Sequence, residues 1–373
     1  MSGVWGNKIE ISIFGESHGK GVGIVLSGLP AGITIDSDMV TLEMKRRAPG
    51  RDPLSTPRKE SDSFEIISGI FDDKLTGAPL CCMIMNTNTR SGDYSEFSHK
   101  FRPGHADYTA HVKYNGFHDY RGGGHFSGRL TAPLVFAGAI CKQVLQSMLP
   151  NIKIGAHIYK ITDIKDDPFD LTSSDTLQPL GKSSQSDIEF NLSSLEGKPF
   201  PVINDTAAKA MKAAIEEARE NGDSVGGVIE CAAINIPAGI GDPFFDSLES
   251  TLAHLIFSIP AVKGLEFGKG FELSNMPGSE ANDDFYFSDD LKIETYTNNN
   301  GGINGGISNG MPITFKAAIK PTPSISKVQK TVDMETEKDA EICIQGRHDP
   351  CIVHRAVPVI EAVTAIGILS LIL

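Results

Sequence analysis

The chain has 373 residues, of which 40% are hydrophobic and 22% charged, as in a globular protein with one large domain or a few smaller ones. The formal net charge of −13 disfavours nucleic acid as the main partner, because a phosphate backbone binds a basic surface. None of the six cysteines forms a Cys-x-x-Cys pair or has the Cys/His spacing of a zinc site, so reduced, buried thiols are expected.

Both ends of the chain favour a soluble, cytoplasmic protein. Residues 1–7 lack the basic and apolar regions of a signal peptide. Residues 356–373 are apolar over a length that only just reaches that of a membrane span, but they contain Glu361. A helix buried in the protein core is therefore the expected structure of this segment.

The first half of the chain predicts strands that alternate with helices. Residues 22–28 have the apolar run of a strand, and a helix is expected from about Ser37, with Asp36 as its N-cap. Residues 79–85 predict another strand, and residues 132–148 are apolar nearly all round, as in a buried helix. Around the first helix, three apolar residues fall at helical spacing: Ile35, Met39 and Leu42.

The second half shows a similar alternation. A helix is expected over residues 205–221, with Asp205 as its cap and Gly222 just beyond its end. A strand, a further helix and a second strand follow, at residues 225–236, 247–257 and 313–319.

Four features recur in the same order in the two halves. The paired segments are 30–33 and 237–240, 77–80 and 310–313, 104–107 and 347–349, and 129–133 and 355–358. We therefore predict one domain over residues 1–373 in which two α/β halves, about 10–148 and 223–373, form an internal duplication. Residues 150–201 are polar and are expected to form a peripheral excursion.

Glycine-flanked polar segments form the candidate site. Residues 15–19 contain Ser17 and His18, and the flanking glycines let the backbone approach a ligand closely. A histidine can move a proton near neutral pH, although a single histidine in such a turn is more often structural. Guanidinium groups suit phosphate and carboxylate ligands, and they cluster at the end of the first helix and beyond it, at Arg46, Arg47, Arg51 and Arg58. A solvated helix end, where cations offset the helix dipole, would also explain Arg46 and Arg47 but explains Arg51 and Arg58 less well.

The densest polar segment is residues 101–129. It contains His105 and three consecutive glycines between Arg121 and Arg129, and such a run can form an anion-binding nest of backbone N–H groups. A plain surface loop is the alternative. Three later segments likewise combine polar or charged residues with glycine or proline, at residues 298–310, 320–324 and 345–351.

The residue types also leave other chemistries open. Five histidines could converge on a metal, but their neighbours are arginine and glycine rather than carboxylates at ligand spacing, so no metal is expected. A Ser/His/Asp hydrolase would need a Gly-x-Ser-x-Gly turn, which the chain lacks. The histidines are His18, His105, His125, His348 and His354.

Taken together and in order, these segments resemble those of the chorismate synthases. The resemblance extends from Trp5 to the last helix and is weakest in the excursion. It implies an α+β fold, a β-α-β sandwich that is usually assembled as a homotetramer. The residues that carry it are 15–19, 102–107, 121–124, 300–310, 320–322 and 346–351.

The resemblance implies a carbon–oxygen lyase that acts on a phosphate, in the last step of the shikimate pathway of aromatic amino-acid biosynthesis. The implied reaction is the anti 1,4-elimination of phosphate from 5-enolpyruvylshikimate 3-phosphate, which gives chorismate. Reduced FMN is the implied cofactor, with NADPH as its potential reductant. A substrate with two carboxylates and a phosphate suits a cationic pocket in an acidic protein.

By the same resemblance, His18 is the acid for the leaving phosphate and Ser17 a proton relay. His105 stabilises the reduced flavin near its N1/C2 oxygen edge, and Asp349 adjusts the proton at flavin N5. The implied anion ligands are Arg47, Arg51, Arg121, Arg129 and Arg347. The implied flavin contacts are His125, Phe126, Ser127, Pro260, Ala261, Gly305, Lys320, Pro321, Thr322, Pro323, Ser324 and Arg347.

The chain departs from the family pattern at four positions. Many relatives have Arg-Ser where this chain has His125 and Phe126, and Asn where it has Pro260. Many also have Arg where it has Pro53, so Arg51 would have to take over that contact. These departures concern flavin contacts and a nicotinamide contact.

Three other function classes remain open at this point. One is an NAD(P)H-dependent flavin reductase, or a bifunctional enzyme that reduces its own FMN, although no Gly-x-Gly-x-x-Gly follows a predicted strand. Another is a non-catalytic anion-binding or scaffold protein. The third is a nucleic-acid binder, which the net charge disfavours.

Overall fold

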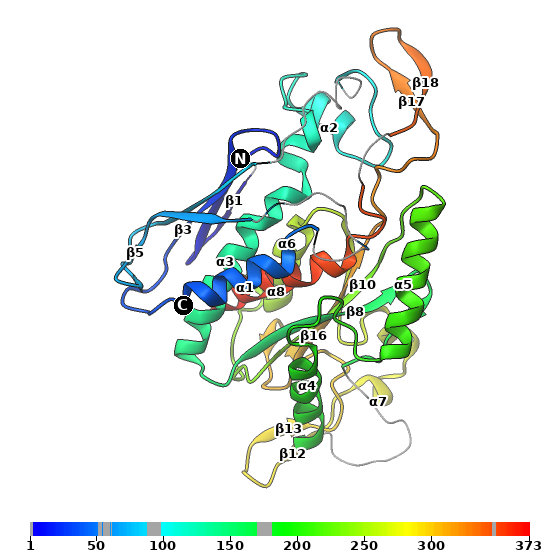
Figure 1. Cartoon of the computed structure of the whole chain (residues 1–373). Helices are drawn as coiled ribbons and strands as arrows, with labels where there is room; N and C mark the ends of the chain where they lie inside the picture. The colour runs from blue at the N-terminus through cyan, green and yellow to red at the C-terminus, as the bar shows by residue number, and fades with distance from the viewer. Residues whose placement is uncertain are drawn as a thin grey trace.

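The computed structural model describes residues 3–50, 54, 60, 62–87, 98–169, 181–344 and 348–373, and for 181–185 the backbone alone. Two five-stranded sheets enclose a central layer of helices (Figure 1). The helix α3 packs on the first sheet, and α8 packs on both α3 and the second sheet. The α+β class predicted from the sequence agrees with these layers.

The first sheet is antiparallel throughout, with the strand order β1-β2-β3-β7-β4. Alternate residues of β3, including Ile24, are fully buried against the helices, as a half-buried strand requires. Its strands are β1 (Val4–Gly6), β2 (Glu10–Gly15), β3 (Gly21–Ser27), β4 (Phe64–Ser68) and β7 (Leu80–Met85).

The second sheet is also antiparallel, with the strand order β11-β16-β10-β8-β9. Its central strand β10 is buried over most of its length because α8 covers one face and α4 packs on the other. Its strands are β8 (Lys153–Ile161), β9 (Ile164–Lys165), β10 (Gly227–Ile234), β11 (Val262–Phe267) and β16 (Ile313–Ile319).

The two sheets have the same strand order when β2, β3, β7 and β4 are matched with β8, β10, β16 and β11. In each half the two central strands are those predicted from the sequence, and each half supplies one long buried helix. A duplicated half would produce this correspondence. The duplication itself stays a prediction, which superposition of the halves would test.

The helices of the central layer are held by close contact between α3 and α8. A Cβ atom on Gly138 of α3 would lie 2.2 Å from the Cβ of Ala362 of α8, so only glycine permits this approach. The main helices are α1 (Ser37–Arg47), α3 (Thr131–Met148), α4 (Gly181–Leu195), α5 (Asp205–Glu220), α6 (Leu248–Ser258) and α8 (Val353–Ile372).

Within the described part of the chain, α8 is the one helix long and apolar enough to span a membrane, but 83% of its most apolar window is buried inside the protein. The predicted buried helix at the end of the chain is therefore confirmed. Its single carboxylate, Glu361, bonds to Arg46 and Lys142 at distances of 2.6 Å and 2.7 Å. Although burial opposes ionisation, these two cations lower the pKa of Glu361 to about 2.

Shorter elements extend from this body. The α2 helix and the β17–β18 hairpin project at one end, and the β12–β13 hairpin projects at the other (Figure 1). Their bounds are β5 (Ile70–Phe71), β6 (Lys74–Leu75), α2 (Asp107–Lys113), α7 (Gly278–Ala281), β12 (Phe285–Phe287), β13 (Ile293–Thr295), β14 (Ile303–Asn304), β15 (Ile307–Ser308), β17 (Gln329–Asp333) and β18 (Lys338–Ile342).

Three local predictions were wrong. Met39 and Leu42 are exposed, and α1 buries Val40, Met44 and Arg47 instead, because it packs on α3 and α8 with its other face. The cap of α5 is not Asp205 but Asn204, whose side chain accepts from the N–H groups of Thr206 and Ala207. The third error concerns the excursion.

The excursion at 150–201 is not peripheral, because β8 within it is a strand of the second sheet. Its polar character comes partly from His157, which is fully buried and bridges two carboxylates. The Nδ1 atom of His157 lies 2.8 Å from Asp166, and its Nε2 atom lies 2.9 Å from Glu230 of β10. Asp166 also accepts from the backbone N–H groups of Ile203 and Asn204, so this charge cluster ties the excursion to the sheet.

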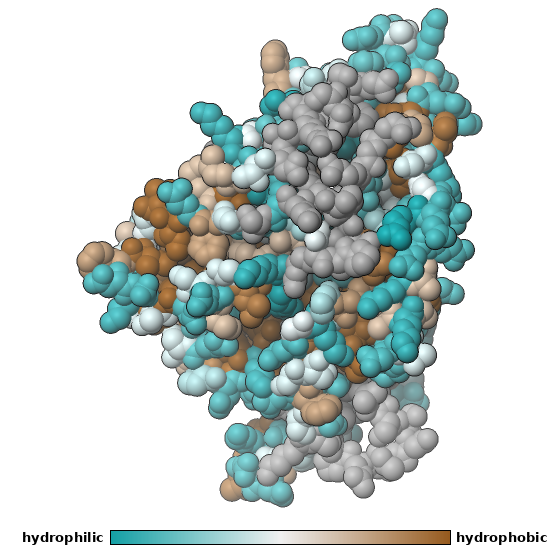
Figure 2. Space-filling model, in the orientation of Figure 1, coloured by the Kyte–Doolittle hydropathy of each residue, from teal (hydrophilic) through white to brown (hydrophobic). Residues whose placement is uncertain are grey.

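Apolar side chains also lie on the surface. Figure 2 shows hydrophobic residues gathered on the side of the molecule that the first sheet forms. Exposed residues in and beside that sheet include Val4, Ile67 and Phe71. Apolar residues that gather in one exposed area mark an interaction surface more often than apolar residues scattered singly over the surface do.

We predict that His157→Gln destabilises the protein by about 3 kcal/mol near pH 6, because it leaves two buried carboxylates facing each other. The carboxylates raise the pKa of His157 against the opposing effect of burial. The stabilisation that the charged His157 ring contributes is therefore fully present below the pKa of the unfolded state, ~6.5. It is lost as the pH rises through the pKa of His157 in the folded state.

Urea unfolding of both proteins between pH 6 and pH 9 measures this effect, and the stability gap should shrink as the pH rises. His99→Gln is the control, because His99 lies 3.8 Å from a mostly exposed Glu335. A gap for His157→Gln that stays constant with pH would contradict the imidazolium assignment.

Candidate functional site

The loop after β2 is held against the glycine-rich segment. Ser17 and His18, the predicted relay and acid, are both buried. The Oγ atom of Ser17 donates to the carbonyls of Arg121 and Gly122, at 3.2 Å and 3.0 Å. The backbone N–H of Ser17 donates to the carbonyl of Gly124 at 3.1 Å. These bonds hold together two segments that are about 105 residues apart in the sequence.

The three consecutive glycines separate the two predicted catalytic histidines. A Cβ atom on Gly122 would lie 2.7 Å from the Nδ1 and Cε1 atoms of His18, and one on Gly123 would lie 3.1 Å from the Nε2 atom of His105. Both glycines have positive φ, of 59° and 85°, which disfavours any side chain. The Gly123 N–H donates to the carbonyl of Tyr120, so it does not contribute to the predicted anion nest.

The His105 ring is fixed from the side opposite Gly123. Its Nδ1 atom lies 2.5 Å from the Oδ1 atom of Asp107. The guanidinium of Arg102 bonds to both oxygens of that carboxylate, each at 2.8 Å. Burial would favour neutral Asp107, but the hydrogen bonds from Arg102 and His105 hold its pKa well below the usual range.

The turn at residues 320–324 brings the second half of the chain to this loop. The Nζ atom of Lys320 donates to the carbonyl of Gly104, and Arg102 lies 3.5 Å from the Oγ atom of Ser324. The hydroxyl of Thr322 donates to the carbonyl of Asp349 at 2.8 Å. Burial and the charge of Lys263 lower the pKa of Lys320.

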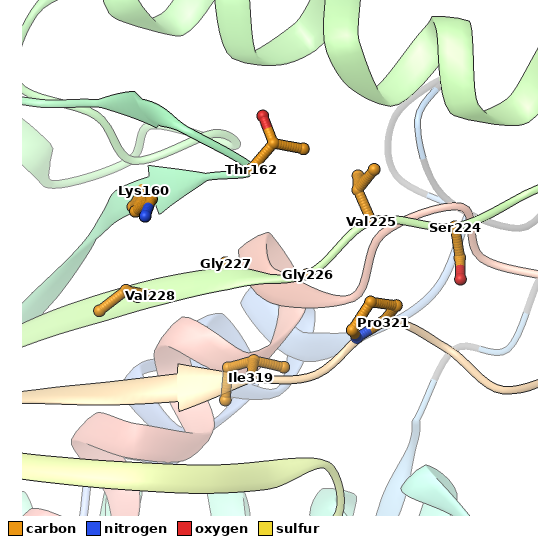
Figure 3. A pocket seen from close by; sticks show the side chains of 9 residues that line it. All are labelled: Lys160, Thr162, Ser224, Val225, Gly226, Gly227, Val228, Ile319 and Pro321. Atoms are coloured by element: carbon orange, nitrogen blue, oxygen red, sulfur yellow. The ribbon is translucent and has the colours of Figure 1, made fainter. Parts of the chain in front are cut away.

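An open hollow of about 400 Å³ lies at the end of the second sheet beside this turn (Figure 3). Pro321, Ser224 and Lys160 are among its lining residues, whereas neither His18 nor His105 lines it. The hollow is therefore separate from the histidine pair.

The carboxylate of Asp349 is paired with the helix that follows it. Its Oδ2 atom lies 2.7 Å from a guanidinium nitrogen of Arg355, at the start of α8. The Nε atom of Arg355 also donates to the carbonyl of Arg47 at 3.3 Å. This contact joins the Asp349 segment to the end of α1.

Arg47 and Arg129 share one buried carboxylate. Asp62 lies 2.5 Å from Arg47 through one oxygen and bonds to Arg129 through the other. Glu60 lies 3.3 Å from Arg129. Burial lowers the pKa of Arg47 to about 10 despite the charge of Asp62. Both predicted anion ligands are therefore paired inside the protein, and their role toward a ligand stays a prediction.

Arg121 is more open to solvent. Its side chain is 41% exposed and forms two hydrogen bonds of 2.8 Å with Asp119. Those hydrogen bonds raise the pKa of Arg121 and lower that of Asp119. Of the predicted anion ligands that the structure describes, Arg121 is the one that presents its guanidinium outward.

The remaining predicted residues divide into two groups. His125 lies 2.9 Å from the carbonyl of Gly15, and Ser127 caps the short turn before α3, so both adjoin the histidine pair. Ala261 accepts from the backbone N–H of Lys320 and follows Pro260 at the start of β11.

The ring of Phe126 packs near that of Tyr114, and Pro321 and Pro323 belong to the 320–324 turn. Gly305 lies between β14 and β15, in a hairpin that bonds to the start of α6. The other three positions, Arg51, Pro53 and Arg347, lie outside the described residues.

Comparison with known proteins decides the family. The chorismate synthase family model matches residues 9–373. The chain is 47% identical to the chorismate synthase of Methanocaldococcus jannaschii and 45% identical to that of Dehalococcoides mccartyi, over 100% of this chain and 96% of each relative. A crystal structure of chorismate synthase aligns with a TM-score of 0.75 and 28% identity, over 98% of this chain and 92% of that one.

The chain belongs to the chorismate synthase family. It is therefore an enzyme of the lyase class, in the biosynthesis of chorismate and the aromatic amino acids. The α+β fold predicted from the sequence is confirmed by the solved chorismate synthase structure.

Several residues that shape this candidate site were not predicted. Arg102 and Asp107 lie within a recognised motif, and their spacing of five residues could have suggested a closed loop. Asp62, Asn86 and Arg355 gave no comparable signal, because each acts on a residue far along the chain. The side chain of Asn86, for instance, accepts from Arg129 and donates to the carbonyls of the His18 loop.

We predict that Gly122→Ala destabilises the protein by about 1–2 kcal/mol or more, because the new Cβ atom meets His18 in a left-handed backbone conformation. Thermal or urea unfolding measures the loss. Gly128→Ala is the matched control, because a Cβ atom there has no neighbour within 4 Å. Equal stability of the two variants would contradict the packing of the glycine run on His18.

Proposed function

We propose that the chain catalyses the anti 1,4-elimination of phosphate from 5-enolpyruvylshikimate 3-phosphate, which gives chorismate, with reduced FMN as cofactor. The main support is the placement of His18 and His105 on either side of the glycine run, in a chain that belongs to the chorismate synthase family. One histidine would serve the leaving phosphate and the other the flavin.

Cationic groups around the histidines suit a multiply anionic substrate. Arg121 reaches solvent beside Gly122, and Lys320 lies against Gly104 in the loop that carries His105. Arg47 and Arg129 would join them only by exchanging Asp62 for an anion of the ligand. Phosphate departure is faster when cations and an acid offset its developing charge, so His18 would donate the proton.

The described residues also fit a reduced, anionic flavin. Glycine at position 123 leaves the Nε2 edge of His105 uncovered by a side chain, and a flat ring needs such a close approach. Arg102, and Lys320 through its contact with Gly104, provide positive charge at the loop that carries His105. When bound, reduced FMN would supply the transient electron that the elimination needs.

Two further roles are proposed from the family resemblance. Asp349, held by Arg355 and Thr322, would handle the proton at flavin N5. Ser17 donates to backbone carbonyls in this structure, so it would relay a proton only after its hydroxyl has turned. NADPH would reduce the flavin if the enzyme also has reductase activity.

We also propose a cytoplasmic homotetramer. The apolar side chains exposed over the first sheet support contact between copies of the chain.

An anaerobic assay tests the function directly. The purified protein, dithionite-reduced FMN and 5-enolpyruvylshikimate 3-phosphate should give chorismate absorbance and an equal amount of phosphate, whereas oxidised FMN should give neither. Absence of chorismate from well-folded protein would overturn the proposal. Steady NADPH oxidation with FMN, without chorismate, would favour a flavin reductase instead.

We predict that His18→Ala and Asp349→Ala each slow turnover at least ~100-fold, which is the usual scale for loss of a proton-transfer group. Initial rates in the anaerobic assay measure this effect. His99→Ala, which removes a histidine from a solvent-exposed pair, is the control. A near-normal rate in either variant would refute the role of that residue without affecting the family.

A further inference from the structure

His105 is enclosed on its Nδ1 side by a pair of charged residues. Its Nδ1 atom lies 2.5 Å from the Oδ1 atom of Asp107 and 3.1 Å from the Nη2 atom of Arg102. Arg102 and Asp107 are buried, with exposed fractions of 6% and 3%. The ring therefore faces a donor and an acceptor, and its protonation state decides which of them it can bond.

The distances select one arrangement. Arginine is always a donor, so a bond from Arg102 would require Nδ1 to be unprotonated. Asp107 is ionised and accepts only, so a bond to it requires a proton on Nδ1. The contact with Asp107 is shorter by 0.6 Å, as the distances of 2.5 Å and 3.1 Å show. Charge-assisted bonds are also the stronger class, so the proton resides on Nδ1.

Arg102 already has its partners in that arrangement. Its Nε atom and its backbone N–H bond to the Oδ2 atom of Asp107, at 2.8 Å and 3.0 Å, and its Nη2 atom bonds to Oδ1. Arg102 thus fixes both oxygens of the carboxylate and directs one of them at the ring. Its Nη1 atom lies 3.5 Å from Ser324, which links this arrangement to the turn of the second half.

We infer that Asp107, fixed by Arg102, is a positioning residue that holds His105 as its Nδ1–H tautomer. The Nε2 atom then faces Gly123 with its lone pair when the ring is neutral. The assignment of a catalytic task to Nε2 rests on the proposed function. The tautomer itself does not, because it follows from the protein alone.

A purely structural role for Asp107 makes a different prediction. Asp107 also closes the 102–107 loop, since it accepts from the backbone N–H of Arg102. Asparagine can preserve the closure of that loop, because its amide oxygen at the Oδ2 position still accepts from the backbone N–H and the Nε atom of Arg102, and only the bond from Nη2 is lost. Its amide nitrogen would then face the ring and donate to Nδ1, which moves the ring proton to Nε2. Asp107→Asn therefore separates loop closure from control of the tautomer.

The test is ¹⁵N NMR of histidine-labelled protein, recorded as a pH series that extends to alkaline pH so that the protonated nitrogen of the neutral ring can be identified, with the His105 signal assigned by its loss in His105→Gln. The wild-type protein should show Nδ1–H and Asp107→Asn mainly Nε2–H. In the anaerobic assay kcat should fall ~10–100-fold with a smaller change in KM, the usual scale for loss of a partner that orients a functional histidine. Asp107→Glu should restore Nδ1–H and part of kcat.

Glu189→Gln is the control, because Glu189 forms a surface ion pair with Lys153 and should leave the His105 signal and kcat unchanged. An Nε2–H tautomer in the wild-type protein, or an unchanged tautomer in Asp107→Asn, would overturn the inference. The wild-type measurement tests the tautomer even if Asp107→Asn does not fold, since it needs only the assignment from His105→Gln. A shifted tautomer in a protein that makes no chorismate would refute the proposed function and support the positioning role.

Discussion

The buried carboxylate of Glu361 organises the centre of the molecule. It lies in the middle of α8 and bonds to Arg46 of α1, to Lys142 of α3 and to the backbone N–H of Ala156 in β8. Breaking such a buried cluster costs several kcal/mol, so the positions of the three helices depend on one another. The site depends on them too, because Arg47, Arg129 and Arg355 lie at the ends of α1, α3 and α8.

Hydrophobic patterning was sufficient to predict most of the core. The central strands and the two long apolar helices bury nearly continuous apolar surface, and such segments differ from loops in composition alone. The prediction failed for β8, because the Ser and Asp runs that follow the strand make residues 150–201 polar as a whole, although β8 itself is largely apolar. It also failed for the buried face of α1, where Arg47 lies inside and Met39 and Leu42 lie outside.

The candidate site was predictable in its segments but not in its pairings. Glycine between histidines and arginines indicated which stretches would meet, and the structure brings His18, His105 and the 320–324 turn together. Sequence patterns could not show that Arg47 and Arg129 share Asp62, because the three residues come from separate parts of the chain. Ion pairs of this kind depend on the tertiary fold, and no local periodicity reports them.

The bridge formed by Asp62 also bears on ligand selectivity. While Asp62 joins Arg47 to Arg129, the protein supplies its own anion to these two cations. A monoanion that displaced it would only replace one negative charge by another and would gain little. A phosphate dianion brings more charge and three acceptor oxygens to the same two guanidiniums. In the proposed function, a ligand would have to displace this internal carboxylate, which chloride or a simple carboxylate would not do, so these arginines would select by valence rather than by negative charge alone.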